Sequence, residues 1–203
     1  MLPIASSNFR WVPLAPAERI DIAVSPYYGW VIERLIEAIK PDASAGEAPE
    51  LPAIEANRPN GTTGEVDFWT SREVRPVINS HVNYVVADTK QWEQSAAYFI
   101  DNHKGVGSFV KNAGLGFAIP YLHNGQMHDY EPDFIVRMKP GNGDAPLNLI
   151  LETKGYDPLK DVKRQAAERW VAAVNADGRF GRWQYQLIEK VSDISAKLTA
   201  LSS

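Results

Sequence analysis

The chain contains no cysteine among its 203 residues. Without thiols it can form neither a disulfide nor a thiolate metal site, so carboxylate, carbonyl or imidazole groups would have to hold any metal. Long apolar runs are missing as well, because no stretch approaches the roughly 18 apolar residues of a membrane helix. The first residues also lack the basic region of a secretory signal. We therefore expect a soluble, cytoplasmic protein with no membrane partner.

An excess of basic residues is also lacking. The sequence has 21 Lys and Arg against 25 Asp and Glu, a net charge of −4, which argues against a protein that coats nucleic acid. The acidic excess lies within residues 1–90, whereas residues 91–203 carry 13 residues of each sign. Residues 153–190 hold eight basic and five acidic residues. This bias permits contact with DNA, but an ordinary solvated helix face produces the same pattern.

The first part of the chain, residues 1–88, reads as an N-terminal extension or linker. A short amphipathic helix is predicted over residues 30–40, where apolar side chains recur at helical spacing and Pro41 follows. The next segment, residues 41–64, is rich in Pro, Gly, Ala and Glu and has no period, which is typical of a loop. From Val66 onward the pattern favours strands.

Residues 89–203 have the pattern of an α/β domain. We predict a helix over 89–103, two strands within 115–138 joined by a turn at Asn124, a strand over 147–155, a helix over 157–176 and a strand over 183–189. The order is αβββαβ, a mixed sheet flanked by helices. The last strand–helix–strand unit should be a right-handed crossover, which makes its two strands parallel neighbours. The glycines of 105–107 and 114–116 are interpreted as turns.

One apolar strand ends abruptly in charged residues. The run LNLIL is followed by Glu152, Thr153 and Lys154, and Glu152 and Lys154 share one side of the strand because side chains alternate. Asp133 stands at the head of a neighbouring strand, directly after Pro132. Two acids on adjacent strands can converge, as a hard ion such as Mg²⁺ requires, and the Thr153 carbonyl would add a third oxygen. Lys154 would lie beside the metal-bound water, so the chemistry indicated is phosphodiester hydrolysis.

Plainer interpretations compete with this one. Glu152 and Lys154 could be a surface ion pair, worth at most about 1 kcal/mol, and Asp133 could stabilise a turn. By chance, about one Glu-x-Lys arises in 200 residues. In this chain the motif occurs once, at the end of its most apolar strand candidate, and that position favours the site.

The Asp133, Glu152 and Lys154 set in the order αβββαβ resembles the PD-(D/E)XK nuclease superfamily. The resemblance implies a restriction-endonuclease-like fold, a Mg²⁺ cofactor for which Mn²⁺ can substitute, and double-stranded DNA as substrate. It implies metal ligation by Asp133 and Glu152 and a catalytic role for Lys154. Glu93, on the preceding helix, matches an acid that often orients the site. Gln165, on the following helix, matches a glutamine that contacts water or phosphate.

More narrowly, FAIPY, HDYEPDFIVRM and LILETKG resemble the C-terminal endonuclease domain of type III restriction enzyme Res subunits. Such subunits imply a helicase motor and a modification subunit as partners. A GxxxxGK[ST] run is absent, so we expect no ATP site in this chain. The chain could be a fragment, a stand-alone nuclease, or a subunit whose motor lies in another chain.

Other residues remain open to two interpretations. Lys160, Lys163 and Arg164 are candidate DNA contacts or a solvated helix face. His123 and His128 suggest a zinc site only weakly, since no third ligand follows at the usual spacing. As a whole, the chain could also be a DNA-binding or assembly module that retains the fold without catalysis, or a repair-type or junction-resolving nuclease.

Overall fold

The computed structural model describes residues 27–38, 62–86, 92–124, 126–141, 145–153 and 157–202. The chain divides into two compact units, one of residues 1–39 with 122–126 and one of residues 40–121 with 127–203. In the first unit, α2 (Tyr28–Ala38) overlaps the helix predicted over 30–40. Most of the loop predicted over 41–64 lies outside the described residues.

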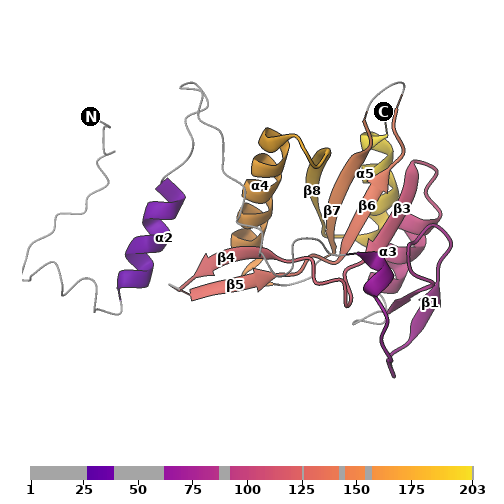
Figure 1. Ribbon diagram of the computed structural model, residues 1–203, viewed down its shortest axis with the longest axis horizontal. Coiled ribbons are helices and arrows are strands. Elements are labelled where there is room, and N and C mark those ends of the chain that lie inside the picture. Colours follow the sequence, from indigo (N-terminus) through magenta and orange to yellow (C-terminus); the bar gives the residue numbers. More distant parts are fainter. Residues whose placement is uncertain are drawn as a thin grey trace, which may run out of the picture. The chain divides into compact units, whose positions relative to one another are not determined.

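A four-stranded mixed sheet is the centre of the second unit (Figure 1). Its strands, in spatial order, are β3 (Val106–Lys111), β6 (Phe134–Met138), β7 (Leu147–Thr153) and β8 (Arg182–Ile188). The pairs β3–β6 and β6–β7 are antiparallel, whereas β7 and β8 are parallel. The parallel pairing predicted for the last two strands is therefore confirmed.

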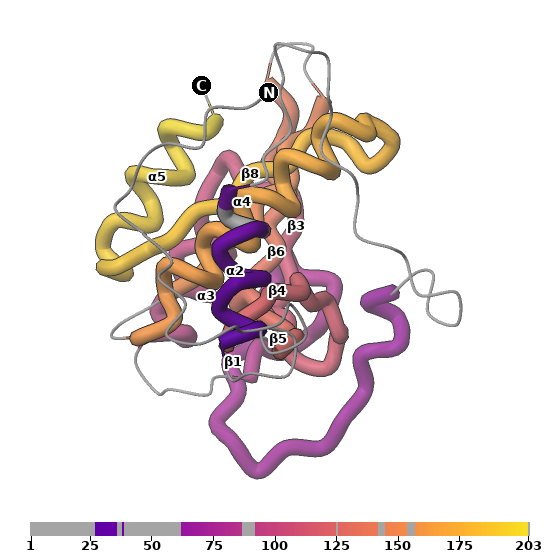
Figure 2. Tube along the Cα trace, turned by 90° about the vertical axis from the view of Figure 1, so that its left-hand side faces the viewer, coloured from indigo at the N-terminus to yellow at the C-terminus, as the bar shows by residue number. Residues whose placement is uncertain are grey.

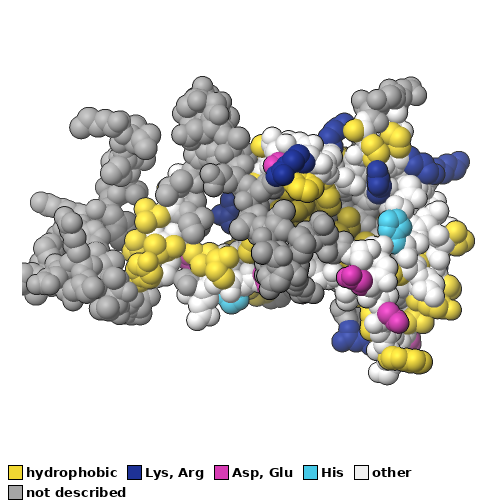
Figure 3. Space-filling model, viewed as in Figure 1, with side chains coloured by type: hydrophobic (Ala, Val, Ile, Leu, Met, Phe, Trp, Pro, Cys, Tyr) yellow, Lys and Arg dark blue, Asp and Glu magenta, His cyan; other side chains and the backbone are white. Residues whose placement is uncertain are grey.

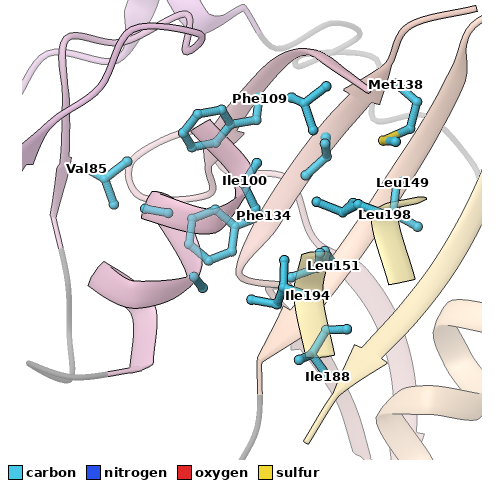
Figure 4. Close-up of a cluster of buried hydrophobic side chains, with 14 of the residues drawn as sticks. Val85, Ile100, Phe109, Phe134, Met138, Leu149, Leu151, Ile188, Ile194 and Leu198 are labelled. Atoms are coloured by element: carbon cyan, nitrogen blue, oxygen red, sulfur yellow. The ribbon is translucent and has the colours of Figure 1, made fainter. Parts of the chain in front are cut away.

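Helices cover both faces of this sheet. They are α3 (Trp92–Asp101), α4 (Lys160–Asp177) and α5 (Ile194–Leu201). The side chains of β7 alternate between the two faces, because Leu149 and Leu151 join one core cluster with α3 and α5, while Ile150 joins another with α4. In Figure 2, α4 and α5 lie on opposite sides of the strands. Figure 4 shows side chains of the first cluster, which include Phe109 and Phe134.

The fold is a restriction-endonuclease-like mixed α/β fold. Counted over the four-stranded sheet with α3 and α4, the elements follow the predicted order αβββαβ. The first of these strands is β3, which was not expected, so the interpretation of residues 105–107 as a turn was wrong for Val106 and Gly107. β3 escaped detection because its last three residues are all buried, which hides the alternation of a half-exposed strand. Within 115–138, β4 (Ile119–His123) and β5 (Gln126–Tyr130) form a separate two-stranded sheet, and β6 follows on its own. Gly114 and Gly116 have φ of 73° and 72°, as the expected turn requires.

A short antiparallel pair precedes the sheet in the second unit. It consists of β1 (Val74–Pro76) and β2 (Tyr84–Val86), after a 3₁₀ turn, η2 (Thr63–Glu65). Val85 is fully buried in the cluster that contains α3, and the Asp101 carboxylate accepts backbone N–H groups from Ile78 and Asn79. The domain limits at residues 88 and 89 stay a prediction. Among the helices of the described residues, none has the length and apolar character to cross a bilayer.

Candidate active site

Asp133 and Glu152 lie together at one end of the central sheet. Asp133 directly precedes β6, Glu152 is the penultimate residue of β7, and the antiparallel register pairs Phe134 with Leu151. Since these paired residues are their chain neighbours, the two acids come side by side. The Asp133 backbone N–H donates to Glu152 Oε2 at 3.1 Å. The structure thus brings together the two acids that the sequence singled out.

The Asp133 carboxylate is held by the end of β7. Its Oδ2 atom accepts the Thr153 backbone N–H at 2.8 Å and the Thr153 hydroxyl at 2.6 Å. Thr153 is buried, so these donors do not exchange readily with water. An ionised acceptor strengthens such hydrogen bonds, which fixes the orientation of the carboxylate.

The Glu152 carboxylate is held by Tyr130. Glu152 is only 3% exposed, and the Tyr130 hydroxyl, at the end of β5, donates to Glu152 Oε2 at 2.8 Å. Burial first, and then the nearby Glu152 charge, raise the pKa of the Tyr130 phenol far above its usual value. Tyr130 therefore stays a hydrogen-bond donor. The sequence alone did not identify Tyr130 as a site residue, because its hydroxyl contact depends on the fold.

Lys111, the last residue of β3, was not identified from the sequence. Its side chain is 7% exposed, and its Nζ lies 3.1 Å from Asp133 Oδ1 and 3.3 Å from Glu93 Oε2. The same ammonium group stands 5.2 Å from the centre of the Phe134 ring. The one signal in the sequence was a lysine at the end of the apolar pair Phe109–Val110. A lysine at such a position is rarely buried without a partner.

Glu93, in the first turn of α3, joins the site through Lys111. It is 8% exposed and forms the second ion pair of the Lys111 ammonium group. Burial is the largest cause that raises the pKa of the Glu93 carboxyl; Lys111 opposes this shift and Asp133 adds to it. The position expected for an orienting acid thus lies next to Asp133, with a buried lysine between them.

Among the described candidates, Gln165 and His128 do not join this group. Lys154 lies outside the described residues, and Gln165 is exposed on α4. His128 is exposed and stacks on Tyr121, with ring centres 5.4 Å apart. Across the part of the chain that the structure describes, no three His or acidic side chains form a cluster that could hold a metal ion.

The candidate DNA contacts on α4 are already paired with acids. Lys160 forms an ion pair with Glu189, Lys163 with Asp157 at 2.9 Å, and Arg164 with Asp161 at 3.2 Å. A phosphate would have to compete with these carboxylates. On the face shown in Figure 3, Lys and Arg side chains occur in separate places among acidic and apolar ones.

The carboxylates at the ends of β6 and β7 are of the kind that binds a hard divalent cation. Asp133 and Glu152 supply carboxylate oxygens from neighbouring strands, and hard cations prefer such oxygens. Asp133 already has a cation, the Lys111 ammonium group, within ion-pair distance. Asp133 thus already pairs with a cationic group, and among the described residues no cluster of three His or acidic side chains that could hold a metal ion is formed.

Comparison with families of known proteins gives one match. Residues 79–187 match the model of a family described as an endonuclease domain. The matched segment contains Glu93, Lys111, Tyr130, Asp133 and Glu152, and it extends from the residues before β2 almost to the end of β8. Searches of curated proteins and of solved structures found no match to the chain.

Proposed function

The chain belongs to the endonuclease-domain family, and from this premise we propose that it hydrolyses phosphodiester bonds of double-stranded DNA with a bound Mg²⁺ ion. The observation that carries the proposal is the pairing of two buried or half-buried carboxylates, Asp133 and Glu152, at the ends of adjacent strands. Carboxylates are rarely placed this way for stability alone, because burying charge is costly.

Each residue of the site has a proposed task. Asp133, Glu152 and the Thr153 carbonyl would hold the ion, with Mn²⁺ able to replace Mg²⁺. When bound, such an ion supplies Lewis-acid activation of water and neutralises charge on the phosphate. Thr153 orients Asp133 through two hydrogen bonds, and Tyr130 orients Glu152 through one. These contacts keep the carboxylates in one geometry before substrate arrives.

The remaining residues are proposed to act on water or DNA. Lys154, two positions after Glu152, would assist deprotonation of water or stabilise charge on the phosphate. Gln165 would contact water or a phosphate, and Glu93 would orient Asp133 through Lys111. Lys160, Lys163 and Arg164 on α4 would approach the DNA backbone by exchanging their acidic partners for phosphates.

The wider setting is also proposed from resemblance. The motif segments are similar to those of type III restriction enzymes, which favours a cleavage module in a cytoplasmic restriction system. A helicase motor and a modification subunit would then be its partners. We propose no ATP site in this chain, because its sequence has no phosphate-binding GxxxxGK[ST] run.

The test is nicking of supercoiled plasmid by the wild type and by Asp133→Asn. The substitution keeps the shape of the side chain but removes its charge, so we expect the cleavage rate to fall at least about a hundredfold. Asp129→Asn is the matched control, since Asp129 is exposed in β5, four positions earlier. Full activity of Asp133→Asn would refute the assignment.

The alternative function is a DNA-binding or assembly module without catalysis. The observation that favours it is the ion pairing of Lys111 with Glu93 and Asp133, which offsets part of the acidic charge of the site. Retention of DNA by the wild type, without cleavage in any divalent ion, would support this alternative. Mg²⁺-dependent cleavage by the same protein would rule it out.

A further inference from the structure

Lys111 and Thr153 bind different oxygens of the Asp133 carboxylate. Thr153 donates its N–H and hydroxyl to Oδ2, whereas Lys111 donates from Nζ to Oδ1 at 3.1 Å. A divalent ion that takes Oδ1 as a ligand therefore meets an ammonium group at the same oxygen. Two cations cannot share one carboxylate oxygen at close range without strong repulsion.

The backbone holds Lys111 in this position. Lys111 pairs with Phe134 in the β3–β6 register, and the next residue, Asn112, donates its backbone N–H to the Asp133 carbonyl at 2.9 Å. The Lys111 side chain is almost completely buried and borders the Phe134 ring. Its ammonium group thus lies beside Asp133 because two strands fix it there.

Charge explains why a lysine is tolerated in this place. Glu93 and Asp133 both lie within ion-pair distance of Nζ, and Glu93 is buried as well. Without this cation, the negative charges of the buried Glu93 and the half-buried Asp133 would repel each other with no counter-ion from Lys111. Burial raises the pKa of Glu93, as expected for a carboxyl whose charge is only partly compensated.

We propose that Lys111 is a positioning residue that acts as an internal counter-cation, holding Glu93 and Asp133 in place in the metal-free protein and competing with the divalent ion for Asp133. Binding of the ion requires the Lys111 ammonium group to withdraw from Oδ1. The proposal rests on the proposed function, in which Asp133 is a metal ligand. A lysine that only packed against its neighbours, or only contacted phosphate, would not compete with the ion for Asp133.

The experiment measures Ca²⁺ affinity by calorimetry for the wild type and Lys111→Met, since Ca²⁺ binds oxygen ligands like those proposed here. We expect Lys111→Met to bind Ca²⁺ at least about tenfold more tightly, because the competing charge is gone. In EDTA the melting temperature of the same variant should fall by at least about 5 °C, because the buried Glu93 and the half-buried Asp133 lose their counter-ion. Adding Ca²⁺ should restore most of that loss.

Matched variants separate this role from general damage. Lys197→Met removes an exposed lysine from α5 and should change neither quantity. In a Glu93→Gln background, Lys111→Met should lower the melting temperature less, because one of the two carboxylates has already lost its charge. If Lys111→Met does not fold, Ca²⁺ affinity of the double variant is compared with that of Glu93→Gln by the same criterion.

Three results would overturn the proposal. They are unchanged or weaker Ca²⁺ binding on loss of Lys111, absence of Ca²⁺ binding in both proteins, and failure of the double variant to fold while Glu93→Gln folds. Neither the binding nor the melting measurement involves cleavage. A wild type that binds Ca²⁺ in the expected manner but never cuts DNA would contradict the proposed function and leave the role of Lys111 intact.

Discussion

Tyr130 shows how one hydroxyl can orient a buried charge. Its O–H donates to Glu152 Oε2, and so does the Asp133 backbone N–H. We predict that Tyr130→Phe destabilises the fold by roughly 1.5–3 kcal/mol, the value of a hydrogen bond to a charged group, and slows cleavage about tenfold. Urea unfolding and single-turnover cleavage measure the two effects.

The matched control is Tyr98→Phe, which removes a hydroxyl from an exposed tyrosine on α3. It should leave both measurements unchanged. Wild-type cleavage by Tyr130→Phe would contradict the orienting role. Because the pKa of Tyr130 is raised far above its usual value, its contribution should also not vary with pH across the neutral range.

Glu93 should make stability depend on pH. Its folded-state pKa is raised, chiefly by burial, so the folded protein binds a proton at this group more tightly than the unfolded chain does. The stabilisation that Glu93 contributes is complete at pH values below the pKa of a Glu in the unfolded chain, about 4.3, and is lost as pH rises through the folded-state pKa. The free energy of unfolding should therefore fall as pH rises, and we predict that Glu93→Gln removes the contribution of Glu93 to this fall.

The measurement is urea unfolding of the wild type and Glu93→Gln at a series of pH values from about 4 to 8. The stability of Glu93→Gln relative to the wild type should increase across that range. Glu65→Gln, which changes an exposed acid in η2, is the control and should run parallel to the wild type. A constant difference between Glu93→Gln and the wild type would contradict the effect of burial on Glu93.

Among single residues, the sequence predicted the site residues that lie at strand ends and missed those whose role depends on contacts between distant segments. Asp133 and Glu152 could be paired in advance, because each borders an apolar strand and neighbouring strands bring their ends together. Lys111 and Tyr130 could not, since their roles depend on which strand lies beside β6 and where β5 ends. The part played by Lys154 is still a prediction.

The elements were predictable where their patterns were strong. β7, α4 and β8 have long apolar or helical periods, and they form the expected parallel crossover. β3 was missed because Gly107 and Ser108 interrupt its apolar pattern and its last three residues are all buried. The pairing partner of a strand also lies far away in sequence, so a local pattern does not show that β4 and β5 form their own sheet.

One element gives a further prediction. Gly178 is the C-cap of α4, with φ of 75°, and it donates its backbone N–H to the Val174 carbonyl at 3.1 Å. A Cβ at Gly178 would meet no heavy atom within 4 Å, so Gly178→Ala tests the backbone conformation alone. We predict a loss of roughly 1 kcal/mol in unfolding free energy, with cleavage unchanged.

Gly178→Asn is the matched variant, because asparagine tolerates the left-handed conformation better than alanine does. Urea unfolding should place it between the wild type and Gly178→Ala. Equal stability of all three proteins would contradict the account of this helix end.

At the scale of the whole molecule, charge is balanced rather than basic. The net charge is −4, and the three basic candidates on α4 are paired with acids. If Lys160 contacts a phosphate, Glu189 competes with that phosphate. We therefore predict that Glu189→Gln strengthens DNA binding up to about fivefold, the equivalent of a surface ion pair worth about 1 kcal/mol.

Asp193→Asn is the control, because it removes the same charge from a nearby exposed position in η3 (Val191–Asp193). Binding to a short duplex at fixed salt compares the two variants. An equal gain for both would show that only net charge matters, and would contradict contact between Lys160 and a phosphate.

The central claim is that Asp133 and Glu152 form a metal-dependent nuclease site. The most direct measurement is plasmid cleavage by the wild type and Glu152→Gln in Mg²⁺, in Mn²⁺ and in EDTA. We expect nicking by the wild type in either ion, none in EDTA, and loss of nicking in Glu152→Gln with its fold retained. Cleavage that persists in EDTA, or in Glu152→Gln at the wild-type rate, would contradict it.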